Sequence, residues 1–307
     1  MHANSRPATA AELVDDQIEL FSLPEVCLRI QELAEDPEAD IREFGELVAQ
    51  DPALTARLLK LVNSAYFGFP SRIDTVSRAI GLVGIEELRS LALASAAVEV
   101  FQDAGGRLDM FSFWRHSIFC GLVARSLARA ARVLHAERLF VLGVLHDLGR
   151  LLIFSRLPEA GAAVVEEAGH CLCDLPAAER GLLGFDHAEA GAELLARWGL
   201  PPVMQEAVRH HHDPAAAAST HGLEAALLEI ANAATHEIER QGEPTAYDPF
   251  GAFLTPAPLD SGAGTPCLDR VPESSWTLAR VGRDQINPAL RTAADAFDDV
   301  LAILYGV

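Results

Sequence analysis

Positive charge is scarce in this 307-residue chain, and almost all of it is carried by arginine. Lysine and arginine together number 24 against 44 acidic residues, so the formal net charge is -20, and Lys60 is the only lysine. A surface this acidic repels the phosphate backbone of nucleic acids and the headgroups of anionic membranes. We therefore expect neither a nucleic-acid partner nor a membrane partner.

Long apolar runs and cysteine patterns are missing as well. No window reaches the roughly 18 to 20 continuous apolar residues of a membrane span, and the N-terminal residues lack the apolar core of a signal peptide. Five cysteines form no disulfide framework in a chain of this length, and Cys171 and Cys173 are too close for the usual two-residue metal motif. The sequence predicts a reduced, cytoplasmic protein.

Strand signals are nearly absent, because alternating β-branched residues with hairpin turns never recur. Apolar residues instead follow helical spacing, and they make up 50% of the chain, which is enough for a sizeable core. We predict an all-α, two-lobed helical bundle, with an N-terminal helical lobe over residues 12–103 and a second helical lobe over 107–240. The segment DAGGR at 103–107 marks the boundary. Residues 241–307 are predicted to form an irregular excursion and a C-terminal helix that packs back on the body.

Helix boundaries follow from caps and breakers. Asp40 and Asp51 suit N-cap positions, whereas Pro37, Gly68 and Pro70 should end or break helices. The run AERLFVLGVLHDLGRLLIF has little polar surface and predicts a single helix at the centre of the bundle. The expected helices are 26–35, 41–50, 53–67, 77–82, 86–100, 111–131, 137–154, 159–169, 186–198, 202–209, 223–240 and 288–305.

Six candidate metal ligands fall in the second lobe in a distinctive order: His116, His146, Asp147, His187, His211 and His212. The pair His146-Asp147 lies in an apolar stretch that would bury both side chains, which is costly unless a partner compensates. A metal ion is the usual partner, because imidazole nitrogen and carboxylate oxygen are good ligands for Zn, Fe, Mn and Ni. A buried His-Asp hydrogen bond is the structural alternative for the pair alone. His210 is expected at the rim of this cluster.

This ordered set resembles the HD superfamily of metal-dependent phosphohydrolases. More narrowly, residues 20–240 resemble the HDOD domain, the HD-related output domain of bacterial signalling proteins. Six strings carry the resemblance: LPEV at 23–26, DPALTARLLKLVNSAYFG at 51–68, AIGLVGIEELRSLAL at 79–93, VLHDLGRLL at 144–152, GFDHAEAGAELLARWGLP at 184–201 and VRHHHDP at 208–214.

The resemblance implies that the six candidates occupy the ligand positions of dinuclear HD phosphodiesterases, with Asp147 as the carboxylate that bridges two ions. The family's final aspartate is replaced by Asn232, whose amide oxygen could coordinate a metal without supplying charge. His236, one helical turn later on the same face, could substitute for it. The sequence departs from the HD phosphodiesterases at two further positions. Arg150 replaces the lysine that often follows the HD pair, and Ser112 stands where those enzymes can have a carboxylate one turn before the first histidine.

Three functions are compatible with these residues. The first and favoured one is a regulatory signal-transduction output module that contacts a separate signalling protein and retains a metal site for one or two divalent ions. The second is a metal-dependent phosphohydrolase of a nucleotide or cyclic dinucleotide, in which Asp147 would hold the metals and Arg150 would stabilise transferred charge. The third is a di-iron protein that binds oxygen. The donor types suit Fe, Mn, Zn or Ni alike, and the enzymatic question stays open.

Overall fold

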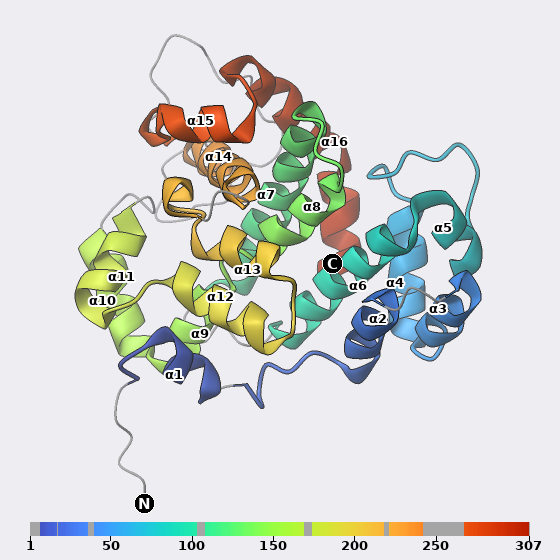
Figure 1. Ribbon diagram of the computed structural model, residues 1–307, viewed down its shortest axis with the longest axis horizontal. Coiled ribbons are helices and arrows are strands. Elements are labelled where there is room, and N and C mark those ends of the chain that lie inside the picture. Colours follow the sequence, from blue (N-terminus) through green and yellow to red (C-terminus); the bar gives the residue numbers. More distant parts are fainter. Residues whose placement is uncertain are drawn as a thin grey trace, which may run out of the picture.

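The computed structural model of the protein describes residues 7–16, 18–35, 40–102, 108–168, 174–217, 221–241 and 267–306. Within these ranges every regular element is a helix, which confirms the predicted all-α class (Figure 1). No helix among the described residues combines the length and the apolar character that crossing a membrane requires. The predicted lobe boundary at 103–107 lies outside the described residues.

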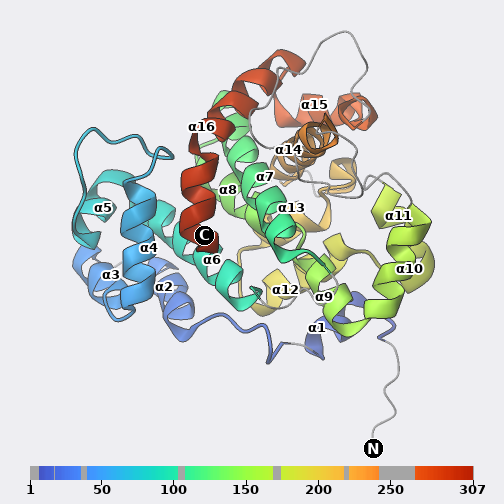
Figure 2. The ribbon, with the colours of Figure 1, turned by 180° about the vertical axis from the view of Figure 1, so that it is seen from behind.

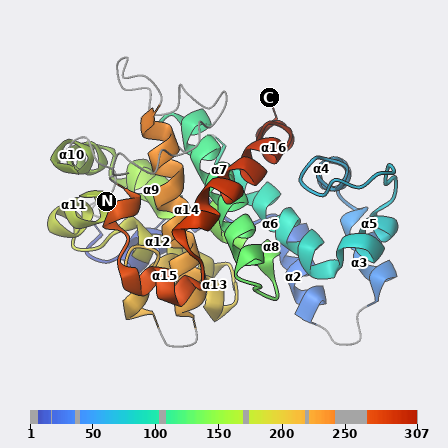
Figure 3. The same cartoon turned by 90° about the horizontal axis from the view of Figure 1, so that it is seen from above.

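The N-terminal helices gather at one side of the molecule (Figures 1 and 3). Two aspartates begin helices there as predicted, since Asp40 forms a capping box with Glu43 and the Asp51 side chain accepts hydrogen bonds from two backbone amides. The helices are α2 (Glu25–Glu35), α3 (Ile41–Val48), α4 (Pro52–Val62), α5 (Val76–Val83) and α6 (Ile85–Val100).

The short helix α1 (Ala10–Asp15) does not lie with them but against α12 (His187–Arg197) of the second lobe. Arg197 forms an ion pair with Asp15 at 2.8 Å, and the Trp198 indole donates to the carbonyl oxygen of Phe21 at 2.9 Å. The segment that precedes α2 in the sequence therefore packs on the second lobe.

The central helices are α7 (Met110–Ala130) and α8 (Ala136–Leu145), whose backbones pack in direct contact. A Cβ added at Gly143 would lie 2.3 Å from the Cα of Gly121, so both crossing positions need glycine. This close contact places the inner face of α7, which carries His116, beside the end of α8.

The single helix predicted over 137–154 is wrong. The chain breaks at His146-Asp147, and a new helix, α9 (Leu148–Arg156), begins there. The His146 Nδ1 atom lies 2.7 Å from the carbonyl oxygen of Gly143, so the ring bonds to the last turn of α8. Because apolar periodicity continues through the break, local sequence patterns do not reveal it. The turn directs both side chains into the interior.

The second lobe is completed by α10 (Pro158–Ala168), α11 (Leu175–Leu183), α12, α13 (Pro202–Arg209) and α14 (Gly222–Gln241). The sequence did not predict α11. Residues 242–266 of the predicted excursion lie outside the described residues, and its last part is helical, since α15 (Glu273–Ala279) begins within it. The predicted C-terminal helix is α16 (Ile286–Tyr305), which packs along α7 and reaches α4 (Figure 2).

A buried arginine joins the two halves of the molecule. Arg125 of α7 is 5% exposed, and its guanidinium lies 3.6 Å from the centre of the Tyr66 ring. The same group donates to the Tyr66 carbonyl oxygen and to the Glu87 carboxylate of α6, each at 3.3 Å. The segment after α4 is thereby fixed to the central helix.

Candidate metal centre

The fold brings the six predicted ligands together from separate elements. His116 lies on α7, His146 and Asp147 form the turn between α8 and α9, and His187 is the first residue of α12. His211 and His212 lie just after α13, beyond its C-cap residue His210. All of these side chains are buried except His212, which is partly exposed. Four chain segments therefore meet at one point in the core of the second lobe.

The Asp147 carboxylate occupies the middle of this cluster. Its Oδ1 atom lies 3.2 Å from the Nε2 atom of His187, 3.4 Å from that of His146 and 4.0 Å from that of His211. Its Oδ2 atom accepts a hydrogen bond from Arg150 at 2.8 Å. One carboxylate oxygen thus faces three imidazole rings while the other is held by a guanidinium.

Two of the imidazoles have their proton position fixed by the backbone. The Nδ1 atoms of His146 and His211 lie 2.7 and 2.6 Å from the carbonyl oxygens of Gly143 and Val208. A carbonyl oxygen only accepts, so each Nδ1 carries the proton and each Nε2 keeps its lone pair. Burial lowers the pKa of His146 to about 4 and that of His211 to about 3, so both rings are neutral at pH 7.

Three ring nitrogens in the cluster are buried without a hydrogen-bond partner: the Nε2 atoms of His116, His146 and His211. A buried polar atom without a partner costs free energy, and a natural fold rarely places three of them side by side. A metal ion would satisfy all three, because a neutral imidazole binds a metal through this lone pair. The donor set therefore fits a divalent transition metal.

Two carboxylates that the sequence did not single out hold two further rings. Glu179 of α11 accepts from the Nδ1 atom of His187 at 2.6 Å and from its backbone amide at 2.9 Å. Burial lowers the pKa of His187, but Glu179 and Asp147 outweigh that effect and raise it to about 10. Glu239 of α14 lies 2.7 Å from the Nδ1 atom of His116. Metal-binding histidines commonly donate their second nitrogen to such a carboxylate.

Besides a group in which His116 lies with His236 and Glu239, the six predicted ligands form two adjacent groups, each within 4.8 Å: His187, His211 and His212 in one, and His116, His146 and Asp147 in the other. The Asp147 Oδ1 atom links them through its 3.2 Å approach to His187. The His187 and His212 Nε2 atoms lie 2.9 Å apart. The arrangement could hold two ions that share Asp147.

The other residues considered from the sequence lie around this cluster. Asn232 of α14 is 6% exposed, and its Oδ1 atom has no hydrogen-bond partner in the described structure. His236, one turn further, bonds to Glu239 at 2.9 Å. His210 lies 3.3 Å from Glu206 and outside both groups, in agreement with a rim position. The Ser112 hydroxyl donates to Asp109 instead of facing the cluster.

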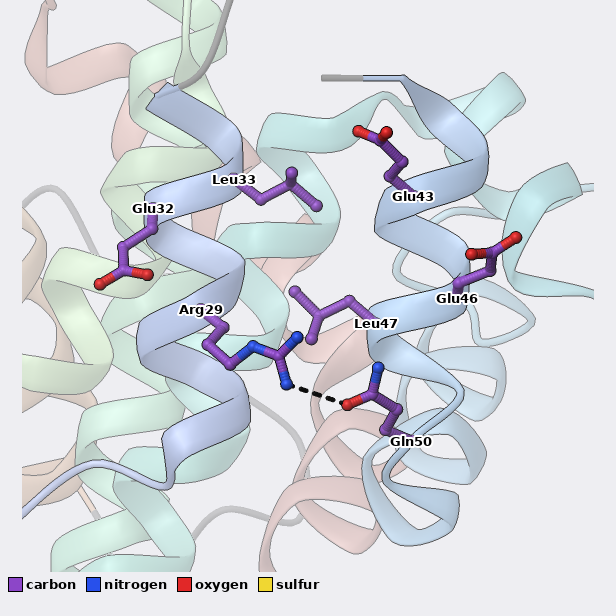
Figure 4. Close-up of a pocket in the computed structure, with 7 residues that line it drawn as sticks. All are labelled: Arg29, Glu32, Leu33, Glu43, Glu46, Leu47 and Gln50. Carbon is purple, nitrogen blue, oxygen red and sulfur yellow. Dashed lines mark hydrogen bonds between the residues drawn. The ribbon is translucent and has the colours of Figure 1, made fainter. Parts of the chain in front are cut away.

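Outside the metal centre, a groove lies between α2 and α3 of the N-terminal lobe (Figure 4). Its volume is about 420 Å³, and its lining combines two leucines with three glutamates, one arginine and one glutamine: Leu33, Leu47, Glu32, Glu43, Glu46, Arg29 and Gln50. Arg29 donates across one end of the groove to Gln50 at 3.1 Å. No residue singled out from the sequence lines it.

Comparison with known proteins identifies the fold family. The chain matches the HDOD domain model over residues 20–214. A Treponema pallidum (strain Nichols) protein of uncharacterized function is 32% identical over 208 residues, which are 67% of this chain but only 39% of that protein, so the chain spans well under half of its length.

Two solved structures share the fold. A candidate phosphohydrolase from Shewanella amazonensis SB2B has 23% identity and a TM-score of 0.71, covering 95% of this chain and 98% of that one. An HDOD domain protein of unknown function from Geobacter sulfurreducens has 24% identity and a TM-score of 0.69, covering 96% and 97%. The match over residues 20–214 shows that the chain belongs to the HDOD domain family.

Proposed function

We propose that this chain is a regulatory protein of signal transduction whose second lobe binds one or two divalent transition-metal ions. The observation that carries the proposal is the set of buried Nε2 atoms on His116, His146 and His211, which lack partners while their Nδ1 atoms are fixed. Proton positions set in this way leave the lone pairs directed at one place beside Asp147. The six proposed ligands are His116, His146, Asp147, His187, His211 and His212.

A regulatory role is supported by where the ligands come from. They belong to α7, the α8–α9 turn, α12 and the segment after α13, so a bound ion would fix four segments against one another. The same α7 holds the N-terminal lobe through Arg125. The ion would thus stabilise the arrangement that the N-terminal lobe presents to a signalling protein, with residues 51–90 as the proposed contact region.

Metal analysis tests the site directly. Untagged protein purified without chelators should contain about one or two equivalents of a transition metal per chain, and the Asp147→Asn variant should contain almost none. The matched control is His210→Gln, which changes a neighbouring histidine that lies outside both ligand groups. A folded parent that takes up no metal from excess Zn, Mn or Fe would refute the site.

The partner surface has its own test. Charge-reversing substitutions of exposed residues within 51–90 should abolish signalling output in the cell while leaving the metal content of the purified protein at the parent level. Signalling that survives these changes would contradict a contact in this region. Because the two readouts are independent, the metal site and the partner surface can fail separately.

Phosphoester hydrolysis is the second candidate, and Arg150 favours it. Its side chain is 13% exposed and lies 2.8 Å from Asp147, so it could reach a phosphate of a nucleotide or cyclic dinucleotide that approaches the cluster. When bound, metal ions would supply Lewis-acid activation of water and phosphate. Asp147 would hold the ions and Arg150 would bind an equatorial phosphate oxygen.

Hydrolysis of a panel of nucleotides, cyclic dinucleotides and an activated phosphodiester by metal-loaded protein tests this activity. Activity should fall at least about tenfold in Arg150→Met, in which the side chain keeps its length and loses its charge. If protein with a proven metal content turns over none of these substrates, the phosphohydrolase activity is refuted and the regulatory role remains.

A further inference from the structure

The geometry points to His236 as an additional metal ligand, with Glu239 as the carboxylate that positions both His236 and His116. The two histidines would complete the ion site formed with His146 and Asp147. This inference rests on the proposed metal-binding function and deepens it.

The Glu239 carboxylate divides its two oxygens between two imidazoles. Oε1 lies 2.7 Å from the Nδ1 atom of His116 and Oε2 lies 2.9 Å from the Nδ1 atom of His236. The Glu239 side chain is 3% exposed. A carboxylate oxygen only accepts, so both Nδ1 atoms donate, and a neutral imidazole in this tautomer keeps its lone pair on Nε2.

The two rings lie parallel to one another. Their planes differ by 25° and their centroids are 4.5 Å apart. Because both Nδ1 atoms face the same carboxylate, the Nε2 atoms lie on the edges that face away from Glu239. The Nε2 atom of His116 is one of the buried nitrogens without a partner and belongs to the ligand group with His146 and Asp147. The ring of His236 stacks on the His116 ring with its Nδ1 atom on the same carboxylate, so its Nε2 atom is directed to the same side.

Charge supports this choice over the other nearby donor. Asn232, His236 and Glu239 follow at helical spacing along one face of α14. Asn232 offers only a neutral amide oxygen. The Nδ1–H group of His236 donates to the Glu239 carboxylate. This hydrogen bond to a negative group makes the Nε2 atom of His236 a stronger donor to a divalent cation. The negative charge that balances the second ion would therefore come from Glu239, which contacts the ligands and not the ion.

Zinc titration of the metal-free protein tests the inference. We expect two equivalents in the parent, whereas His236→Gln should lose the second equivalent or bind it about 10- to 100-fold more weakly. His210→Gln should bind like the parent, and Asn232→Ala should weaken the second ion less than His236→Gln does. Introducing Asn232→Asp into His236→Gln should restore the second equivalent, because a carboxylate then stands one turn away on the same face.

Cobalt absorption gives a readout of the ligand field that a purely structural role would not change. The d–d bands of the cobalt-loaded parent should shift in both His236→Gln and Glu239→Gln and stay unchanged in His210→Gln. Thermal unfolding of the metal-free variants checks that they are folded. If His236→Gln does not fold, Glu239→Gln still tests the inference.

The outcomes separate two levels of failure. A parent that binds no metal refutes the proposed function itself. A parent that binds a single ion, a His236→Gln variant that binds two ions with parent affinity and spectrum, or an Asn232→Ala variant that loses more affinity than His236→Gln overturns this inference alone.

Discussion

Four histidines of the candidate metal centre are oriented by the partner of the Nδ1 atom. Carbonyl oxygens hold His146 and His211, and carboxylates hold His116 and His187. This difference has a chemical consequence, because a carboxylate partner makes the imidazole a stronger donor than a carbonyl does. The strongest nitrogen donors of the cluster therefore depend on Glu179 and Glu239.

We expect Glu179→Gln to weaken metal binding about 10- to 100-fold, since the amide can still accept from His187 but no longer supplies a charge. Competition between the protein and a zinc-binding dye measures this change. Glu224→Gln, which alters a glutamate in the first turn of α14, should leave the affinity unchanged. Equal zinc affinity in parent and Glu179→Gln would show that the charge of Glu179 does not contribute to metal binding.

At the scale of the elements, the α9–α12 contact brings His187 to Asp147. Gly149 is the closest point, because a Cβ there would lie 2.0 Å from the carbonyl oxygen of His187 and 2.8 Å from the amide nitrogen of Gly191. Both nearest atoms belong to the backbone, so no side-chain rotation could relieve the overlap. The two helices would have to move apart, and the cluster would open with them.

Gly149→Ala should therefore lower the free energy of unfolding by about 3 kcal/mol or more, at the upper end of the cost of overpacking. Gly181→Ala is the matched control. Gly181 is solvent-exposed in the middle of α11, and no atom lies within 4 Å of the added Cβ. The substitution should raise the free energy of unfolding by about 0.5–1 kcal/mol. Urea unfolding of both variants measures the difference. Similar effects in the two variants would contradict the contact.

The packing of α15 on α14 should depend on pH through Glu229. Burial raises the pKa of Glu229 to about 7, against a hydrogen bond with Ser275 that lowers it. Since the folded protein holds this proton more tightly than the unfolded chain, the contribution to stability is complete below the ordinary pKa of 4.5 and is lost as pH rises through about 7.

Between pH 5 and pH 8 the parent should therefore lose roughly 1–2 kcal/mol of stability relative to Glu229→Gln, which carries no titrating group at this position. Urea unfolding at both pH values measures the loss, and the difference between parent and variant removes the contribution of the net charge of -20. A parent and a variant with the same pH dependence would refute the assignment to Glu229.

At the scale of the whole molecule, the two lobes are tied together at several places. The chain start packs α1 on α12, and the chain end packs α16 on both α7 and α4. Between them, Arg125 fixes the segment after α4 to the central helix. The position of the N-terminal lobe is thus coupled to the same helix that carries His116.

Removing this arginine tests how strongly the lobes depend on it. Arg125→Met should cost about 3–5 kcal/mol of unfolding free energy, because it leaves the buried Glu87 carboxylate without its cation. The double variant Arg125→Met with Glu87→Gln should recover part of this loss, which urea unfolding would show. A double variant that is less stable than Arg125→Met would contradict the pairing.

The sequence by itself determined the helical class, most helix positions and the identity of the candidate ligands. Helical periodicity and caps such as Asp40 and Asp51 are local, so they are visible in a single chain. The ligand candidates could be named because His and Asp in an apolar context are costly without a partner. His236 was also named as a possible substitute ligand, whereas nothing in the sequence assigned a role to Glu239 three residues later.

Only the tertiary structure decided how these residues meet. Glu239 and His116 are 123 residues apart and touch because α14 packs on α7. Glu179 lies on a helix that the sequence did not reveal, and the break at His146-Asp147 interrupts an apolar pattern that continues on both sides. Hydrogen bonds between distant segments depend on helix packing, which local patterns do not encode. The candidate ligands were therefore predictable, whereas the groups that orient them were not.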